Sequence, residues 1–223
     1  MTELVHMDKA HLYYDTGISL RDLSLSIGQD EFVYLFGPSG SGKTSLLGLM
    51  YMELVPNTGT VTVLGYDTNR LKRKEVARQR KRIGRMFQDP RLLNDRDIYH
   101  NLALPLEISG FSGKDARHRV FQKADELSIR SRLNHFPYEL SGGEKQRVAL
   151  AMASIISPEL MLVDEPTAQL DEESSRIIID TLWKIQEAGT SVVFATHKEE
   201  VIQIDPARTI TLNKGEIIQD KPR

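Results

Sequence analysis

Two short stretches of the sequence carry residue types that together could bind and cleave a nucleoside triphosphate. The first, GPSGSGKT at 37–44, matches the pattern G-x-x-x-x-G-K-[ST] of phosphate-binding loops. Glycines let backbone N–H groups turn toward phosphate oxygens. Lys43 can then reach the β- and γ-phosphates, and the Thr44 hydroxyl can bind Mg²⁺. The residues expected to contact nucleotide here are Gly37, Pro38, Ser39, Gly40, Ser41, Gly42, Lys43, Thr44 and Ser45.

The second stretch is an apolar run at 160–163 that ends in two carboxylates, Asp164 and Glu165. Asp164 suits Mg²⁺, either directly or through a water molecule. Glu165 suits a general base that polarises the attacking water. Two acids at a strand end, taken alone, would be interpreted as solvated charges. The phosphate loop elsewhere in the chain favours the catalytic interpretation.

These side chains must be held by strands that end at one edge of a sheet. Residues 32–36, 160–163 and 191–195 are continuous apolar runs, typical of parallel strands covered on both faces. Each run ends in polar residues, where open α/β sheets place their ligands. A helix is predicted directly after the phosphate loop, over 45–52.

The remaining segments predict further elements around this sheet. Residues 3–13, 23–27 and 59–64 are strand-like, and we expect them to form an antiparallel sheet. Between 91 and 157 apolar residues recur at helical spacing, so a helical segment is inserted between core strands. Residues 209–219 read as a closing hairpin that turns at an Asn-Lys-Gly sequence.

Composition limits the classes of protein that remain. The 223 residues are 40% hydrophobic and 27% charged, which is ordinary for a globular chain. The absence of cysteine excludes disulfides, thiolate zinc sites and iron–sulfur clusters. A net charge of −2 gives no basic footprint, so no nucleic acid is expected as a partner. The first residues lack the apolar core of a signal peptide, and no apolar run reaches membrane-spanning length. Any membrane spans are therefore expected from another chain.

The string LSGGEKQ at 140–146 distinguishes this sequence from other phosphate-loop proteins. It lies between the phosphate loop and the acidic strand end, and it resembles the signature motif of the ABC family of ATPases. Ser141 and the N–H groups of Gly142 and Gly143 would form a second anion site at the start of a helix over 144–153.

The resemblance also assigns roles to single residues that would be unremarkable alone. Gln88 matches the family's Q-loop glutamine, which senses Mg²⁺ and the γ-phosphate, and His197 matches the switch histidine. Asp171 falls in the segment that resembles the D-loop. Tyr13 stands where the family places an aromatic that stacks on adenine. Tyr14 is the adjacent alternative, and an aromatic that only packs the small sheet is a third.

The resemblance covers essentially the whole chain and implies an α/β fold. Its parts would be a RecA-like core, an antiparallel β subdomain and an inserted α-helical subdomain at about 91–157, within one domain spanning 1–223. It implies an ATP hydrolase that uses ATP and Mg²⁺ in a head-to-tail homodimer. Ser141 of one copy would face the phosphates bound by Lys43 of the other. One departure is in the D-loop, where related ATPases usually have Gly-Asn or Ser-Ala and this chain has Ala168-Gln169. This difference puts communication between subunits in question.

The stretch 87–110 is similar to the FtsE subfamily of cell-division ATPases, which work with the membrane protein FtsX. The matching positions are Leu92, Leu93, Asp95, Arg96, Tyr99, Asn101, Ala103, Leu104, Pro105 and Leu106. This resemblance implies a peripheral subunit at the cytoplasmic face of the cell membrane. Leu92, Leu93, Tyr99 and Leu102 are expected to line a groove for a helix of an FtsX-like partner.

Other functions remain open alongside the FtsE-like one. ATPases of lipoprotein-release or macrolide-efflux transporters share the Leu-Leu and N-x-x-x-P-L elements but usually lack Asp-Arg-x-x-Tyr. ABC proteins that act on ribosomes or DNA usually join two ATPase units or carry a long coiled coil, and this chain has neither. The basic stretch 70–85 could contact lipid or nucleic acid. We favour a solvated helix face leading into a strand.

Overall fold

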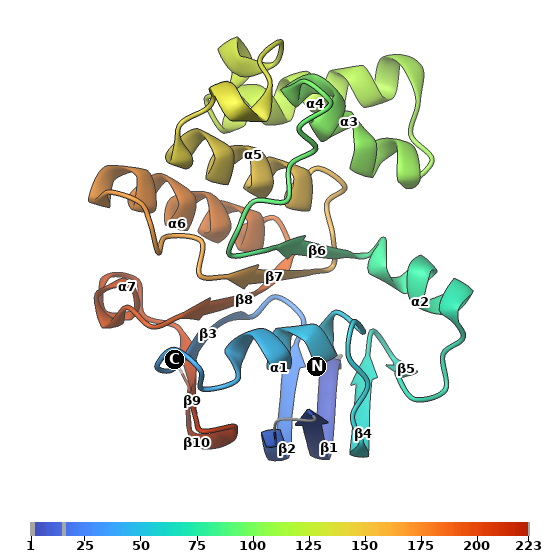
Figure 1. The fold of residues 1–223 in the computed structure, drawn as a ribbon, viewed down its shortest axis with the longest axis vertical. Helices are drawn as coiled ribbons and strands as arrows, with labels where there is room; N and C mark the ends of the chain where they lie inside the picture. The colour runs from blue at the N-terminus through green and yellow to red at the C-terminus, as the bar shows by residue number, and fades with distance from the viewer. Residues whose placement is uncertain (1–2, 15–16, 223) are drawn as a thin grey trace.

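The computed structural model describes residues 3–14 and 17–222 (Figure 1). Its central element is a six-stranded sheet in the order β10-β9-β3-β8-β7-β6. Strands β3, β6, β7, β8 and β9 run parallel, and only β10 is antiparallel to its neighbour. The strands are β3 (Phe32–Phe36), β6 (Ile83–Met86), β7 (Leu160–Asp164), β8 (Ser191–Thr196), β9 (Arg208–Asn213) and β10 (Glu216–Lys221).

A second sheet of four strands has the order β2-β1-β4-β5 and is antiparallel throughout. It confirms the antiparallel sheet predicted near the N-terminus. Apolar and polar side chains alternate along its strands: Leu23, Leu25 and Ile27 are buried, while the residues between them are more exposed. Its strands are β1 (Glu3–Tyr14), β2 (Gly17–Gly28), β4 (Thr58–Val63) and β5 (Tyr66–Asp67).

Helices cover both faces of the six-stranded sheet, and α3, α4 and α5 all lie between β6 and β7 in the chain. The helices are α1 (Lys43–Met50), α2 (Arg73–Arg80), α3 (Ile98–Ile108), α4 (Gly113–Glu126), α5 (Gly142–Ser154), α6 (Glu172–Glu187) and α7 (Glu199–Ile204). Helix α1 begins two residues before the predicted start. The closing hairpin of β9 and β10 turns at Lys214-Gly215, as predicted.

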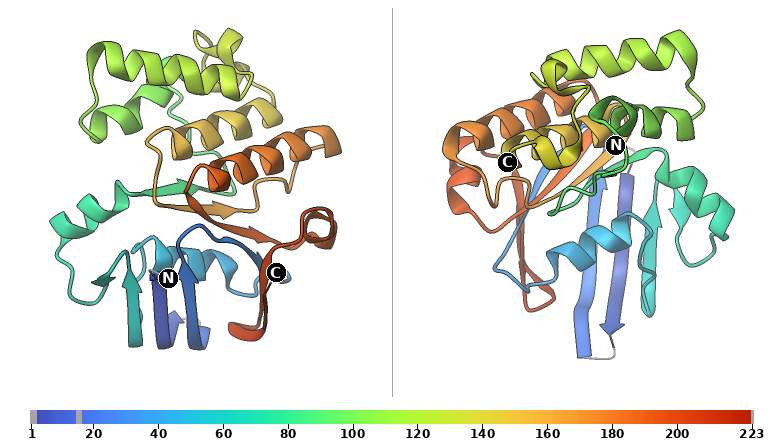
Figure 2. Two further views of the ribbon diagram at one scale, coloured as in Figure 1. Left: turned by 180° about the vertical axis from the view of Figure 1, so that it is seen from behind. Right: turned by 45° about the horizontal axis from the view of Figure 1, so that its top comes forward.

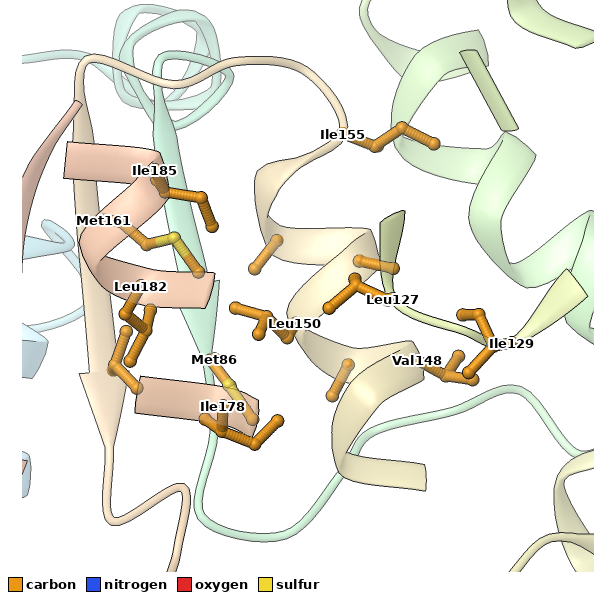
Figure 3. Packing of buried hydrophobic residues seen from close by; sticks show 14 of the residues in the cluster. Met86, Leu127, Ile129, Val148, Leu150, Ile155, Met161, Ile178, Leu182 and Ile185 are labelled. Carbon is orange, nitrogen blue, oxygen red and sulfur yellow. The ribbon is translucent and has the colours of Figure 1, made fainter. Parts of the chain in front are cut away.

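The continuous apolar strands are explained by two hydrophobic clusters on opposite faces of the sheet. On β3, Val33 and Leu35 belong to the cluster with α1, whereas Tyr34 belongs to the cluster with α5 and α6. Figure 3 shows the second cluster, in which Met161 of β7 faces Leu182 of α6. Because both faces are covered, both side-chain sets of each strand are apolar.

Parallel strands bring distant sequence segments to one edge of the sheet. The carboxyl ends of β3, β7 and β8 meet there, so the residues that follow these strands become neighbours. Helices α3 and α4 lie at one end of the molecule and the four-stranded sheet at the other (Figures 1 and 2). Within 3–14 and 17–222, no helix combines the length and apolarity needed to cross a bilayer.

Candidate functional site

The loop at 37–44 connects β3 to α1, and two of its glycines are required by close packing and backbone conformation. A Cβ atom on Gly37 would lie 2.1 Å from the Leu212 carbonyl oxygen, which is far inside contact distance. Gly42 has φ 105° immediately before α1, a conformation that residues with a side chain rarely adopt. The loop therefore approaches its neighbours more closely than larger residues would permit.

A cavity of about 420 Å³ opens in front of this loop. It unites the phosphate loop with two predicted catalytic residues that are distant in sequence. Its lining consists of Ser19, Ser39, Gly40, Gly42, Lys43, Thr44, Ser45, Gln88 and Glu165. Of the other loop residues, Gly37 and Pro38 present their carbonyl oxygens to Lys43, and the Ser41 carbonyl accepts from the Gly215 N–H.

Lys43, Glu165 and His197 form a connected chain of side chains. Lys43 Nζ lies 3.2 Å from Glu165 Oε1 and donates to the Gly37 carbonyl at 2.8 Å. The second carboxylate oxygen of Glu165 lies 2.9 Å from His197 Nδ1. Glu165 has φ 44°, a strained value for a residue with a side chain, and such strain is commonly found at functional sites. Both oxygens of the carboxylate are thus oriented by basic groups.

Asp164 lies behind this chain and is almost completely buried. Burial raises the pKa of its carboxyl group, while a hydrogen bond with Thr44 and the charge of Arg85 act in the opposite direction. Arg85 Nη2 lies 3.7 Å from Asp164 Oδ2, and Asp164 Oδ1 is buried without a hydrogen-bond partner. Hence one oxygen of this carboxylate is still available as a ligand.

The oxygen atoms around Thr44 fit a magnesium ion bound together with nucleotide. Mg²⁺ prefers oxygen ligands and usually takes one or two carboxylates plus substrate phosphates. Thr44, Asp164 and the Gln88 amide supply a hydroxyl, a carboxylate and a carbonyl oxygen. Among the described residues no cluster of three His, Cys, Asp or Glu side chains could hold a metal alone. The phosphates would therefore have to complete the coordination.

The signature residues lie outside this cavity, at the start of α5. Ser141 caps the helix by accepting from the Glu144 N–H at 3.3 Å, and its own N–H donates to Glu144 Oε2 at 2.8 Å. This bond and the Arg132 guanidinium lower the pKa of Glu144 to about 2. Gly142 and Gly143 form the first turn. Ser141, Gly142 and Gly143 are absent from the lining that the described residues provide.

Comparison with known proteins places this arrangement in a family. The model of the ABC transporter family matches residues 20–168. The chain belongs to the ABC transporter family. It is 34% identical to the cell division ATP-binding protein FtsE of Streptococcus pneumoniae (strain D39), over 94% of this chain and 92% of the relative. The FtsE proteins of Mycobacterium tuberculosis and Escherichia coli K12 are 40% and 37% identical, over 92% and 97% of this chain and 89% and 97% of theirs.

Two solved structures agree with this assignment, and both are dimeric. One is a bacterial ABC transporter cassette, and the other is an ATP-binding cassette in a post-hydrolysis state bound to ADP and phosphate. Each has a TM-score of 0.91 and 32% identity, and covers 98% of both chains. The chain is thus a nucleotide-binding ATP hydrolase of the ABC type, and the predicted α/β fold is confirmed.

In this ABC ATPase, Asp171 caps α6 by accepting from the Ser174 N–H at 2.7 Å. A Cβ atom on Gly143 would lie 3.2 Å from Ser174 Oγ, so the first turns of α5 and α6 are neighbours. Gln146 adds a link that sequence reasoning missed, because its side chain donates to the Gln88 carbonyl oxygen at 3.2 Å. The signature helix and the Q-loop are therefore joined directly.

The two candidate adenine aromatics lie at the end of β1 and both are about two-fifths exposed. The Tyr13 ring stacks on His11, with centroids 6.1 Å apart. The Tyr14 hydroxyl lies 3.3 Å from Ser45 Oγ, at the phosphate loop. Ser19, which the sequence did not single out, donates to the same Ser45 oxygen at 3.1 Å.

The basic stretch 70–85 is only partly a solvated face. Arg78 on α2 is exposed, but Arg80 donates to the Met52 carbonyl, and Arg82 pairs with Glu159 at 2.6 Å. Arg85 is the main exception, because only 3% of its side chain is exposed. In the sequence Arg85 ends a run of basic residues and so resembles a surface charge, although it lies in strand β6, which leads to Gln88.

Of the four residues expected to line a partner groove, Leu93 is exposed, as a groove residue must be, but Leu102 is not. Leu102 is completely buried, and the Tyr99 ring packs on Phe121 of α4 with centroids 6.0 Å apart. A hollow of about 370 Å³ lies instead between α2, β6, α3 and the end of α5. The prediction is wrong for Leu102 because the apolar face of α3 packs on α4 and α5.

Proposed function

We propose that this ABC ATPase is FtsE-like: it binds MgATP between two copies of itself and uses hydrolysis to gate an FtsX-like membrane partner in cell division. Binding of MgATP between two copies is supported by the separation of the phosphate loop from the signature motif within one chain. Lys43 contacts Glu165, which in turn contacts His197, whereas Ser141 lies outside the cavity that Lys43 and Glu165 line. A second copy can supply the missing signature.

In this proposal each side chain has a defined task. Lys43 neutralises charge on the β- and γ-phosphates, and Gln88 senses the γ-phosphate. Glu165 orients the attacking water and accepts its proton, while His197 holds that carboxylate in place. Bound Mg²⁺, held by Thr44, Asp164 and Gln88, would supply charge neutralisation on the phosphates. A tyrosine at the end of β1 would stack on adenine.

The homodimer is supported by the two dimeric structures that the chain resembles. In a head-to-tail pair, Ser141 and the N–H groups of Gly142 and Gly143 would meet the phosphates bound by the other copy. Asp171, at the neighbouring start of α6, would lie in the same interface. The proposed sharing makes each site depend on both chains.

The membrane partner and the cell-division role rest on the FtsE relatives, which match nearly the whole chain. We propose that residues 91–157 act as the helical subdomain that receives the partner. The hollow between α2, β6, α3 and α5 is the docking place we propose, because it borders Phe87 directly before the Q-loop glutamine. The chain would then work as a peripheral subunit at the cytoplasmic face of the cell membrane.

Purification from native membranes tests this function. A tagged Glu165→Gln chain, trapped with ATP, should co-purify an FtsX-like protein from detergent-solubilised membranes, while a Lys43→Ala chain should retain less of it. Depletion in cells should cause chains or filaments. Recovery of a lipoprotein-release or efflux permease, with normal division, would establish the transport alternative and refute the cell-division role.

A further inference from the structure

The proposed docking hollow combines apolar walls with an excess of positive charge. Tyr51, Phe87, Ile108 and Met152 contribute large apolar surface. Arg80, Lys81 and Arg85 also line it, and none of the described residues in its lining is an aspartate or glutamate. A surface of this kind suits a ligand that is mainly apolar and carries negative charge.

Two of these cations bond only to neutral groups among the residues that the structure describes. Arg80 donates to the backbone carbonyls of Tyr51 and Met52 at 3.1 and 2.9 Å. Lys81 donates to the Ile108 carbonyl across the hollow. These bonds fix the positions of both charged groups without neutralising them.

Arg85 is the least satisfied of the three. Its guanidinium lies 3.7 Å from Asp164, and its Nε and Nη1 atoms are buried without a hydrogen-bond partner. The rings of Tyr51 and Phe87 lie 6.0 and 5.2 Å from it and give partial compensation. A buried guanidinium normally uses its N–H groups in hydrogen bonds, so these two point to an absent acceptor.

We propose that this hollow recognises a carboxylate on an amphipathic helix of the membrane partner, with Arg85, Lys81 and Arg80 as its cationic contacts. The inference rests on the proposed function, since it names the chemistry of that partner. Apolar residues of the helix cover Tyr51, Phe87 and Ile108, and one Asp or Glu side chain enters between them. An isolated headgroup or phosphate would leave the apolar walls uncovered, so a helix with an acid fits better.

Photo-crosslinking from position 108 identifies the occupant in native membranes. Ile108 is 55% exposed at the border of the hollow, so a photoreactive residue there keeps the full chain intact. We expect it to capture a cytoplasmic segment of an integral membrane protein with an Asp or Glu within one helical turn of the crosslink. Crosslinks to lipid or nucleic acid would overturn the proposal.

Charge variants then test the recognition itself. Arg85→Gln and, separately, the exposed Lys81→Glu should lower the amount of purified complex by about tenfold, while Arg78→Glu on α2, outside the hollow, should not. Changing the partner's acid to Lys should restore binding to the Lys81→Glu chain. Lys81→Glu keeps the test valid if Arg85→Gln fails to fold.

The outcomes distinguish failure of the proposed function from failure of carboxylate recognition alone. If position 108 captures no membrane protein although the Glu165→Gln chain co-purifies one, the inference is wrong and the proposed function stands; if neither experiment yields a membrane protein, the proposed function fails as well. If it captures one whose crosslinked segment has no acid, or if Lys81→Glu binds like wild type, only the carboxylate recognition is wrong. The wild-type complex should weaken as salt is added, and this dependence on salt should be smaller in the Arg85→Gln variant, which has lost one of the three cations.

Discussion

Glu165 is held more tightly than a surface acid would be. Lys43 and His197 contact different oxygens of its carboxylate. Its backbone N–H donates to the carbonyl oxygen of Ala195 near the end of β8. The strained φ of Glu165 is thus maintained by three separate contacts. Such an arrangement fixes where an activated water can lie.

Replacing Glu165 by Gln should therefore separate binding from turnover. The amide keeps the shape but cannot accept the proton, so we expect ATP binding to persist while hydrolysis falls by about 10² to 10⁴-fold. The variant should also dimerise with ATP, because a negative charge near the phosphates is removed. Phosphate release and size-exclusion chromatography measure the two effects. Wild-type hydrolysis would remove Glu165 from the role of general base.

The aromatic pair at the end of β1 allows a direct comparison of neighbours. Loss of the stacking ring should weaken nucleotide binding by about 1 to 3 kcal/mol, equally for ATP and GTP, since stacking discriminates poorly among bases. Tyr13→Ala is expected to show this loss, with Tyr14→Ala as the matched control. If only Tyr14→Ala weakens binding, its contact with Ser45 identifies the adenine platform instead.

At the scale of elements, the apolar runs predicted the strands well because both faces of each are covered. The sequence predicted less well how helices pack on one another. The Asn101 side chain illustrates the difficulty: it donates to the carbonyls of Leu93, Arg96 and Asp97 and so shapes the loop before α3. Part of the FtsE-like pattern is therefore structural, and a linear pattern cannot separate this role from partner recognition.

Long-range polar pairs were equally hidden from the sequence. Arg85 and Asp164 lie on adjacent parallel strands that are far apart in the chain, and nothing local marks either as the other's partner. The phosphate loop, Glu165 and His197 were found because each belongs to a motif with fixed spacing. Ser19 and Gln146 contribute contacts that depend on tertiary packing alone.

The capping box of α5 makes a prediction about pH. Since Glu144 has its pKa lowered to about 2 in the folded chain, its ionised form stabilises folding at pH values above its ordinary pKa. This contribution should disappear as the pH falls from the ordinary carboxyl range toward 2. Glu144→Gln should consequently lower the Tm near neutral pH but have progressively less effect in acid. Thermal unfolding of the wild-type and Glu144→Gln proteins across this pH range measures the effect. A difference in Tm that does not change with pH would contradict the prediction.

For the whole molecule, the separation of Ser141 from the phosphate cavity predicts sites shared between two chains. A Lys43→Ala chain and a Ser141→Arg chain should each be inactive alone. In their heterodimer one site takes both defects and the other takes neither, so mixing should restore one working site per pair. Phosphate release from a mixture with two different affinity tags measures the rescue, and a mixture of two Lys43→Ala preparations is the control. If the mixture is inactive although heterodimers have formed, the same experiment is repeated with Gln169→Asn in the D-loop of both chains. Activity restored by this change would show that coupling between the two sites had suppressed hydrolysis. A mixture that stays inactive would refute shared sites.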